Sequence, residues 1–196
     1  MHPGKKAFVI GEVGLKNELR AAGVQVLGSE GDKITMSDKE LEEYQCDSCV
    51  QTLVVGIDFN FSFRKLSEAS LYLQNGCDFI TANKDRTSGN QDRMIPACGT
   101  VVKMIEVASG QKAETAGKPS RFAFDLIREQ HGLEDVPLSK FLMVGDNLET
   151  DIKFGSNCGI DTLLVLSGCT SEQKALEVLN NDQLSAAEAK PTHVQP

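Results

Sequence analysis

The sequence predicts an α/β protein whose strands are largely parallel. Short apolar runs alternate along the chain with segments whose apolar residues recur at helical spacing. Glycines directly follow several of these helical segments, where helices commonly end. Such alternation is typical of strand–helix–strand units, in which helices cover the faces of a parallel sheet.

The first half of the chain contains three predicted strands and four predicted helices. Apolar runs predict strands at Ala7–Ile10, Thr52–Ile57 and Phe79–Ala82. Helical spacing predicts helices over residues 15–22, 37–44, 63–73 and 101–108, of which the second opens with the capping box Ser-Asp-Lys-Glu. The polar stretch 83–99 predicts a long loop, and long loops in compact domains are often functional.

The second half continues the same alternation. The pattern predicts, in order, a helix over 121–130, a strand over 141–144, a helix over 150–156, a strand over 162–166 and a helix after Thr170. The tail from Ala186 is expected to fray. Polar residues between Gly110 and Gly117 separate the two halves, so we expect a domain boundary there.

The composition argues against several classes of partner. The 196 residues carry 20 basic and 28 acidic side chains, a net charge of −8, whereas nucleic acids and anionic membranes attract a basic surface. No apolar run approaches the ~20 residues of a spanning helix, and the first residues show no signal-peptide pattern. Six cysteines are too dilute for a disulfide scaffold. We therefore expect reduced thiols, a cytoplasmic location, and neither nucleic acid nor membrane as partner.

Cys46 and Cys49 form a Cys-x-x-Cys pair. A zinc site would need a second pair of ligands, and none follows at a suitable spacing. A redox pair is expected at the beginning of a helix after a strand, whereas this pair precedes the apolar run at 52–55. We expect neither a metal nor a redox role for it.

The most informative stretch is the apolar run that stops at Gly145 and is followed by Asp146 and, five positions later, Asp151. Lys118 lies upstream in Gly-Lys-Pro, ahead of a predicted helix. Carboxylates at the end of a strand with a lysine nearby suit a Mg²⁺ and phosphate site, because Mg²⁺ is usually held by one or two carboxylates plus substrate phosphate. Taken singly, the three also fit ordinary roles: a turn residue, a helix cap and a surface lysine.

These residues resemble a known family. Gly117-Lys118-Pro119 with Gly145-Asp146-x-x-x-Thr150-Asp151 resembles motifs III and IV of the haloacid dehalogenase superfamily. Further stretches, at residues 54–61, 65–73, 79–85 and 99–106, resemble its 4-nitrophenylphosphatase and phosphoglycolate phosphatase branch, which includes the NagD-type enzymes. The resemblance extends over residues 5 to 170.

The resemblance implies a fold. These enzymes have a Rossmann-like core interrupted by a C2-type α/β cap domain, with an Asp-x-Asp nucleophile motif before the cap and motifs III and IV after it. The resemblance therefore implies that residues 1–110 form the cap domain and residues 111–196 the C-terminal part of the phosphatase core. An N-terminal core segment with the nucleophile would then be missing, and we expect the chain alone to be inactive.

The stretch Asp58–Asn60 is similar in pattern to the nucleophile motif. Asp58-Phe59-Asn60 follows an apolar run, as an Asp-x-Asp motif would. The position of the general acid is Asn60, however, and an amide cannot protonate a leaving alcohol. We expect Asp58 to cap the following loop or helix instead.

The resemblance also implies roles for single residues. Asp146 is expected to be the direct Mg²⁺ ligand, and Asp151 to accept a metal-bound water or to hold Lys118. Lys118 is expected to be the catalytic lysine, because its compact charge suits the nucleophile carboxylate and the phosphoryl oxygens. Asn147 and Gly145 would support these groups.

The implied reaction is Mg²⁺-dependent hydrolysis of a small phosphorylated metabolite through an aspartyl-phosphate intermediate. The loop residues Asn83, Lys84, Asp85 and Arg86 face the core in relatives and are candidates for substrate contacts, although Lys84 and Arg86 fit solvated loop charges equally well. Relatives often dimerise through the cap, so the resemblance is compatible with a homodimer of this chain. The alternatives are a non-enzymatic truncated isoform with a cap-based interaction or dimerisation surface, and a two-piece enzyme whose N-terminal half is another chain.

Overall fold

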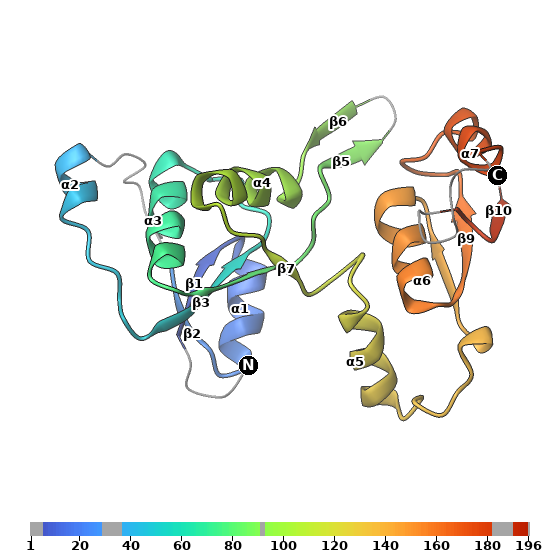
Figure 1. Cartoon of the computed structure of the whole chain (residues 1–196), viewed down its shortest axis with the longest axis horizontal. Coiled ribbons are helices and arrows are strands. Elements are labelled where there is room, and N and C mark those ends of the chain that lie inside the picture. Colours follow the sequence, from blue (N-terminus) through green and yellow to red (C-terminus); the bar gives the residue numbers. More distant parts are fainter. Residues whose placement is uncertain (1–5, 29–36, 91–92, 182–189, 196) are drawn as a thin grey trace. The chain divides into compact units, whose positions relative to one another are not determined.

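The protein is described by a computed structural model, which places residues 6–28, 37–90, 93–181 and 190–195, without the side chains of Asp38 and Asn90. The chain divides into two compact units (Figure 1). Unit 1 comprises residues 1–82 and 97–114, and unit 2 comprises residues 83–96 and 115–196. Each contains strands and helices in alternation, so the predicted α/β class with parallel strands is confirmed.

Unit 1 is built on a sheet with the strand order β2-β1-β3-β4-β7. Its strands are β1 (Lys6–Ile10), β2 (Gln25–Leu27), β3 (Val50–Val55), β4 (Asp78–Thr81) and β7 (Glu114–Thr115), the last of which straddles the boundary of the units. β1 pairs in parallel with β2 and β3, and β3 pairs in parallel with β4. This sheet places the predicted strands of the first half side by side.

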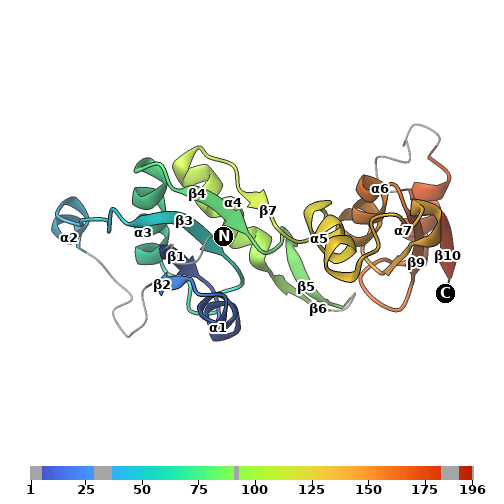
Figure 2. The ribbon, with the colours of Figure 1, turned by 90° about the horizontal axis from the view of Figure 1, so that it is seen from below.

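Helices cover both faces of this sheet (Figure 2). The helices of unit 1 are α1 (Val13–Ala21), α2 (Asp38–Glu42), α3 (Phe63–Gln74) and α4 (Cys98–Ser109). Phe8 and Ile10 share one buried cluster with α3 and α4, whereas Ala7 and Val9 share another with Leu19 of α1. Successive side chains of a strand point to opposite faces, so a strand that is covered on both faces reads as a continuous apolar run.

The capping box and two helix ends in unit 1 agree with the structure, whereas α4 begins at Cys98, inside the stretch predicted as a loop. The Ser37 side chain accepts the Glu40 N–H and the Glu40 side chain accepts the Ser37 N–H, so the capping box is confirmed. α4 ends at Gly110, whose φ of 73° is in the left-handed region that glycine adopts without strain. Gly76, with a φ of 84°, follows the end of α3 in the same way.

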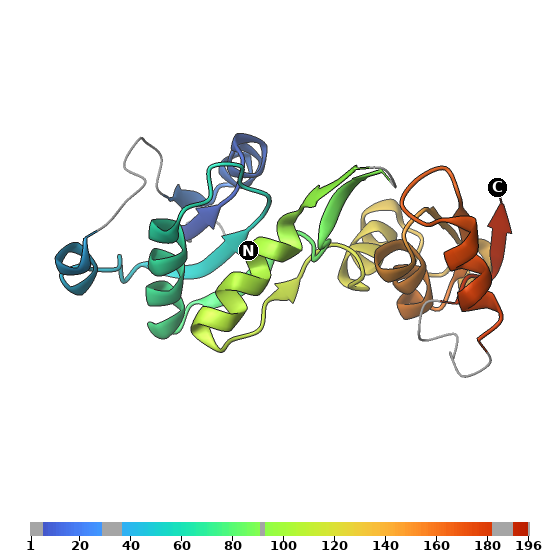
Figure 3. The same ribbon diagram turned by 90° about the horizontal axis from the view of Figure 1, so that it is seen from above.

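Unit 2 contains a second parallel sheet, with the order β10-β9-β8, and a separate antiparallel hairpin (Figure 3). The strands are β8 (Leu142–Gly145), β9 (Asp161–Val165) and β10 (His193–Gln195), and the hairpin consists of β5 (Thr87–Asn90) and β6 (Arg93–Pro96). The helices are α5 (Phe122–His131), the short η1 (Leu138–Lys140), the π-helical turn η2 (Leu148–Ile152), α6 (Lys153–Cys158) and α7 (Glu172–Leu179).

The sheet of unit 2 differs on its two faces. Leu164 of β9 packs with Leu148 and Ile152 of η2 and with Ala175 of α7. On β8, by contrast, Leu142 and Val144 point to the other face and are 50% and 52% exposed. The described residues therefore cover one face of this parallel sheet more completely than the other.

Two predictions about the backbone were wrong. The stretch 83–99, predicted as a loop, contains the β5–β6 hairpin, which lacks the alternation of apolar and polar residues that would have revealed it. In the tail, residues 193–195 form β10 instead of fraying, because they pair with β9. Thr192 adds mutual hydrogen bonds with Thr162. Residues 186–189 of that tail lie outside the described residues.

The short strands β2 and β7 were not predicted from the sequence either. No described helix is both long and apolar enough to cross a membrane. The structure groups residues 83–96 with unit 2. The division into a cap domain at 1–110 and part of a core at 111–196 stays a prediction.

Candidate active site

The structure brings together three residues predicted to form a site, Lys118, Asp146 and Asp151, at the carboxyl end of β8. Lys118 Nζ donates to Asp151 Oδ1 at 2.5 Å. The other oxygen of Asp151 accepts the backbone N–H groups of Asp146 and Asn147, both at 3.1 Å. The Asp151 side chain is 6% exposed and Lys118 is 46% exposed, so a buried carboxylate holds a lysine that still reaches solvent.

Gly145 makes this arrangement sterically feasible. A Cβ atom at Gly145 would collide with the carboxylate of Asp151, so any side chain there would displace it. Asn147 is the N-cap of η2, and its side chain accepts the N–H of Glu149 at 2.9 Å. These two residues therefore fix the turn that carries Asp146 and Asp151.

A loop after β9 holds Asp146, and sequence reasoning missed it. Asp146 Oδ2 accepts the N–H of Cys169 at 2.7 Å, and its backbone oxygen accepts the Thr170 hydroxyl at 2.6 Å. A Cβ at Gly168 would collide with the Asp146 carboxylate. Because neighbouring parallel strands end at the same sheet edge, Ser-Gly-Cys-Thr after the apolar run of β9 was the signal for this loop.

These contacts set the charge of the site. Burial acts to raise the pKa of Asp146, but hydrogen bonds from Cys169 outweigh it and hold the pKa below its ordinary value. Asp146 is therefore ionised at neutral pH. Burial, followed by the neighbouring Asp146, raises the pKa of the Cys169 thiol, so this cysteine stays protonated.

The donor set fits a hard divalent cation such as Mg²⁺. The described residues contain no group of three or more His, Cys, Asp or Glu side chains that could hold a metal ion. Asp146 and Asp151 supply two carboxylates, and Mg²⁺ typically takes one or two carboxylates and keeps its remaining positions for water and substrate phosphate. Asp151 already accepts three hydrogen bonds, which makes Asp146 the more available ligand.

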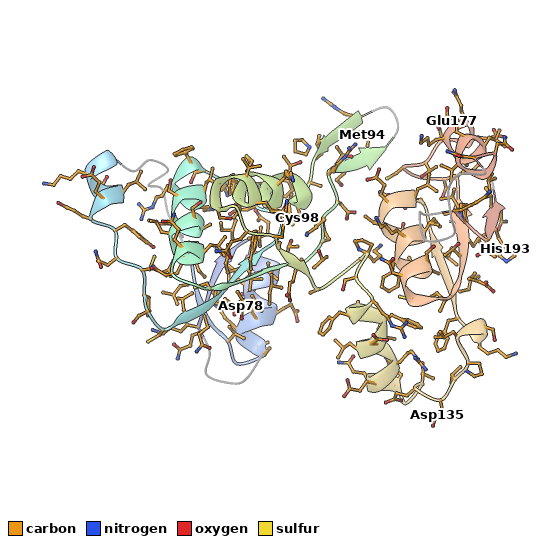
Figure 4. The ribbon with its side chains drawn as sticks, in the orientation of Figure 1. Asp78, Met94, Cys98, Asp135, Glu177 and His193 are labelled. Carbon is orange, nitrogen blue, oxygen red and sulfur yellow. The ribbon has the colours of Figure 1, made fainter. Side chains whose placement is uncertain are left out.

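A pocket of about 880 Å³ lies beside these residues within unit 2. Its lining is Lys84, Asp85, Arg86, Thr87, Met94, Pro119, Asn147, Leu148, Glu149, Thr150, Lys153, Cys169, Thr170, Ser171, Lys174 and Val178. Met94 comes from β6, where Figure 4 labels it. Three of the four predicted loop candidates, Lys84, Asp85 and Arg86, thus contribute to the wall. The fourth, Asn83, accepts the N–H of Asp85 at 3.1 Å and shapes the loop.

The structure agrees with the rejection of Asp58 as a nucleophile. Asp58 lies in unit 1, is buried, and accepts the N–H of Asn60 at 2.9 Å. Its second oxygen accepts from Lys65 Nζ at 2.7 Å. Both oxygens thus serve to cap the loop, as expected.

Comparison with known proteins shows which family this site resembles. Residues 115–196 match the family model described as HAD-hydrolase-like, where HAD stands for haloacid dehalogenase. This part of the chain is therefore similar to the haloacid dehalogenase-like hydrolases. The match contains Lys118, Asp146 and Asp151, so the resemblance seen in the sequence motifs is confirmed.

Curated relatives extend the similarity to most of the chain. Chronophin of Rattus norvegicus is 38% identical over 173 residues, which is 86% of this chain and 50% of that protein. Glycerol-3-phosphate phosphatase of Homo sapiens is 36% identical, over 86% of this chain and 53% of that protein. Phosphoglycolate phosphatase 2 of Arabidopsis thaliana is 37% identical, over 88% and 58%. The chain thus spans about half the length of these relatives.

Solved structures of phosphatases share the fold. The p-nitrophenyl phosphatase of Archaeoglobus fulgidus aligns with a TM-score of 0.74 and 26% identity, over 97% of this chain and 64% of that one. A glycerol phosphate phosphatase of Mycobacterium tuberculosis, solved with magnesium, gives a TM-score of 0.74 at 24% identity, over 100% and 51%, and supports the fold alone.

Proposed function

We propose that this chain carries the metal- and phosphate-binding part of a Mg²⁺-dependent phosphatase that acts on small phosphorylated metabolites. One observation carries the proposal: in the part that matches the hydrolase family model, Lys118, Asp151 and Asp146 converge at the end of β8, beside a pocket. The carboxyl ends of parallel strands are where ligands of α/β sheets bind.

Each residue has a defined task in the proposed site. Mg²⁺, when bound, would neutralise charge on the phosphoryl group that is transferred. Asp146, kept ionised by its hydrogen bonds with Cys169, would hold the metal directly. Lys118 would place its charge against the phosphoryl oxygens, and Asp151 would keep that ammonium group in position.

The nucleophile and the general acid are assigned to no described residue of this chain. Asp58, which imitates the motif, is engaged with Lys65 and the backbone of Asn60. We therefore propose that this chain by itself does not turn over phosphate esters. The other proposals are that residues 1–110 form a cap domain, that two copies associate through it, and that the protein works in the cytoplasm.

Binding of inorganic phosphate tests the proposed site directly. Amide chemical shifts of the labelled chain should respond to phosphate more strongly with Mg²⁺ than without it, and first around residues 118 and 146–151. Lys118→Ala and Asp146→Asn should each weaken this binding about tenfold, as expected for the loss of one charge-assisted contact.

Matched controls are Lys140→Ala and Asp135→Asn, because both side chains are exposed in the same unit. A response to phosphate that is the same in Lys118→Ala as in Lys140→Ala would refute the proposed site and favour a non-enzymatic role.

Turnover gives an independent test. The purified chain with Mg²⁺ should release no 4-nitrophenol from 4-nitrophenyl phosphate. If activity appeared, was lost in Asp58→Ala and survived Asp146→Asn, the assignment of the motifs would be wrong.

A further inference from the structure

The loop that joins β9 to α7 contacts Asp146 at two places. The Thr170 hydroxyl donates to the backbone oxygen of Asp146 at 2.6 Å, and the Thr170 N–H donates to the same oxygen at 3.2 Å. The Cys169 N–H donates to Asp146 Oδ2 at 2.7 Å. The loop therefore holds both the main chain and the carboxylate of the residue that is proposed to bind Mg²⁺.

The packing of this loop leaves the Asp146 carboxylate little freedom. A Cβ atom at Gly168 would collide with Oδ2 of Asp146, so the loop backbone lies directly against the carboxylate. Thr170 is 7% exposed, so water does not compete freely for its hydroxyl. A short hydrogen bond from a buried hydroxyl to a backbone oxygen fixes that part of the main chain in one position.

The elements on either side of the loop share one buried cluster. Leu164 of β9 and Ala175 of α7 pack together with η2, the turn that follows Asp146. Ser171, the residue after Thr170, is the N-cap of α7. The cluster thus brings the loop close to Asp146, and the hydroxyl of Thr170 is the side-chain group that joins the two.

A second buried threonine in unit 2 has a different task. The hydroxyl of Thr162 lies 3.3 Å from that of Thr192 and accepts the Thr192 N–H at 2.9 Å, which holds β10 against β9. None of these hydrogen bonds involves Asp146. Thr162 therefore shows what a purely structural threonine does in this unit, and it offers a matched control for Thr170.

We propose that Thr170 is a positioning residue that fixes Asp146 so that its carboxylate is held ready for Mg²⁺. Groups that orient a metal ligand from behind typically raise metal affinity about 10- to 100-fold. Without the hydroxyl, the backbone oxygen of Asp146 would keep only the longer bond from the Thr170 N–H. The loop would then move away and take the Cys169 N–H with it. This inference rests on the proposed function and adds a residue that lies outside the recognised motifs.

Mg²⁺ affinity tests the inference without any turnover. Dissociation constants for the full chain would be measured by amide chemical-shift titration with MgCl₂. Thr170→Val keeps nearly the same shape but removes the hydroxyl, and it should weaken binding about tenfold. Thr170→Ser keeps the hydroxyl and should bind Mg²⁺ nearly as well as the wild type. Gly168→Ala should weaken binding independently of Thr170, because its Cβ displaces the Asp146 carboxylate.

The amide proton of Cys169 gives a second readout, in the absence of metal. A hydrogen bond to a carboxylate moves an amide proton downfield, so this resonance should move upfield in Thr170→Val and stay in place in Thr170→Ser. Thr162→Val is the control. It removes a hydroxyl that is equally buried and should lower the stability of unit 2, yet leave both the Mg²⁺ affinity and the Cys169 resonance unchanged.

Three results would overturn the inference. They are an unchanged Mg²⁺ affinity in Thr170→Val, an equal loss of affinity in Thr162→Val, and a loss in Thr170→Val while the Cys169 resonance stays in place. In each case Thr170 would serve only the stability of the unit. If the wild type did not respond to Mg²⁺, or if the response persisted in Asp146→Asn, the proposed function would fail first and the inference would fall with it.

Discussion

The two units of this chain differ in how completely they bury the faces of their parallel sheets. Unit 1 has a five-stranded sheet with buried apolar clusters on both faces, the larger of which includes Leu53. Unit 2 has a three-stranded parallel sheet whose buried residues fall into two small clusters, one of which includes Leu164. On its other face, Leu142 and Val144 are half exposed.

The unit with the larger buried core is not the unit that holds the candidate active site. Parallel sheets are normally covered on both faces, and unit 1 meets that condition. Unit 2 holds Lys118, Asp146 and Asp151 and the pocket, yet has the smaller core. We expect unit 1 to be the more stable of the two, and the substitutions that follow test this order.

Two buried leucines compare the cores directly. Leu53 in unit 1 and Leu164 in unit 2 are both fully buried. Leu53→Ala should cost about 3–5 kcal/mol and Leu164→Ala about 2–3 kcal/mol, because a cavity in the smaller cluster can relax more easily. Hydrogen-exchange mass spectrometry reports the loss of protection separately for β3 and for β9.

Exposed positions on each unit serve as controls. Val107→Ala on α4 and Leu176→Ala on α7 remove side chains that are 75% and 51% exposed and should each cost less than about 0.5 kcal/mol. Before any substitution, β3 and β4 should exchange more slowly than β8 and β9. Equal and strong protection of both sheets in a monomer would show that unit 2 needs no further cover, and the comparison would fail.

Asp151→Ala should produce the next largest effect. The change leaves the N–H groups of Asp146 and Asn147 and the ammonium of Lys118 without their acceptor. We expect a loss of about 1–3 kcal/mol in unit 2. Protection in β8 and η2 should fall while protection in β3 stays unchanged. Glu149→Ala, in the same turn but exposed, should leave both sheets as they are, and a loss equal to that of Asp151→Ala would contradict the role given to these hydrogen bonds.

Elements that depend on residues close together in the sequence could be predicted, whereas elements that depend on distant partners could not. The strands and helices of the first half that were predicted follow from patterns within one segment, such as the capping box at Ser37 or the glycine after α4. The strand β10 forms because it pairs with β9. The loop at 168–170 is placed by its hydrogen bonds with Asp146. Such partners lie more than twenty positions away, as with Asp146 and Cys169, and no local pattern reveals them.

The same distinction applies to the site. Asp146, Asp151 and Lys118 could be named in advance because their spacing resembles known motifs, and the structure places them in contact or in one turn. Asp85 could be named only as one of four loop candidates. Its buried oxygen depends on how the loop packs beside Thr150, which sequence spacing does not encode.

The half-exposed face of unit 2 should affect association more than stability. Leu142→Lys and Val144→Lys replace apolar side chains that are half exposed on β8, the edge strand of its sheet. Each should change stability by less than about 0.5 kcal/mol but reduce concentration-dependent association, because charged side chains protect sheet edges. Sedimentation velocity at several concentrations measures this. Val107→Lys on unit 1 is the control, and an equal reduction by all three variants would place the associating surface elsewhere.

The smallest effect concerns the rate at which buried thiols react. Cys98 lies at the start of α4 in unit 1, where Figure 4 labels it. Cys158 in unit 2 and Cys98 are 0% and 2% exposed, whereas Cys49 is exposed. Iodoacetamide at pH 8 should therefore alkylate Cys49 first. Alkylation of Cys158 should precede that of Cys98, because the less stable unit opens more often. Mass spectrometry of timed digests measures the three rates.

The pH dependence of these rates sharpens the test. Burial raises the pKa of Cys158 from the ordinary thiol value of 9.0 to about 11. A group whose pKa is higher in the folded than in the unfolded state contributes stability that is complete below the unfolded value and is lost as the pH rises through the folded one. Unit 2 should thus open more readily between pH 9 and pH 11, and alkylation of Cys158 should gain on that of Cys98 over this range. If Cys98 reacted as fast as Cys158 at pH 8, and the ratio did not move with pH, the units would not differ in stability as their cores indicate.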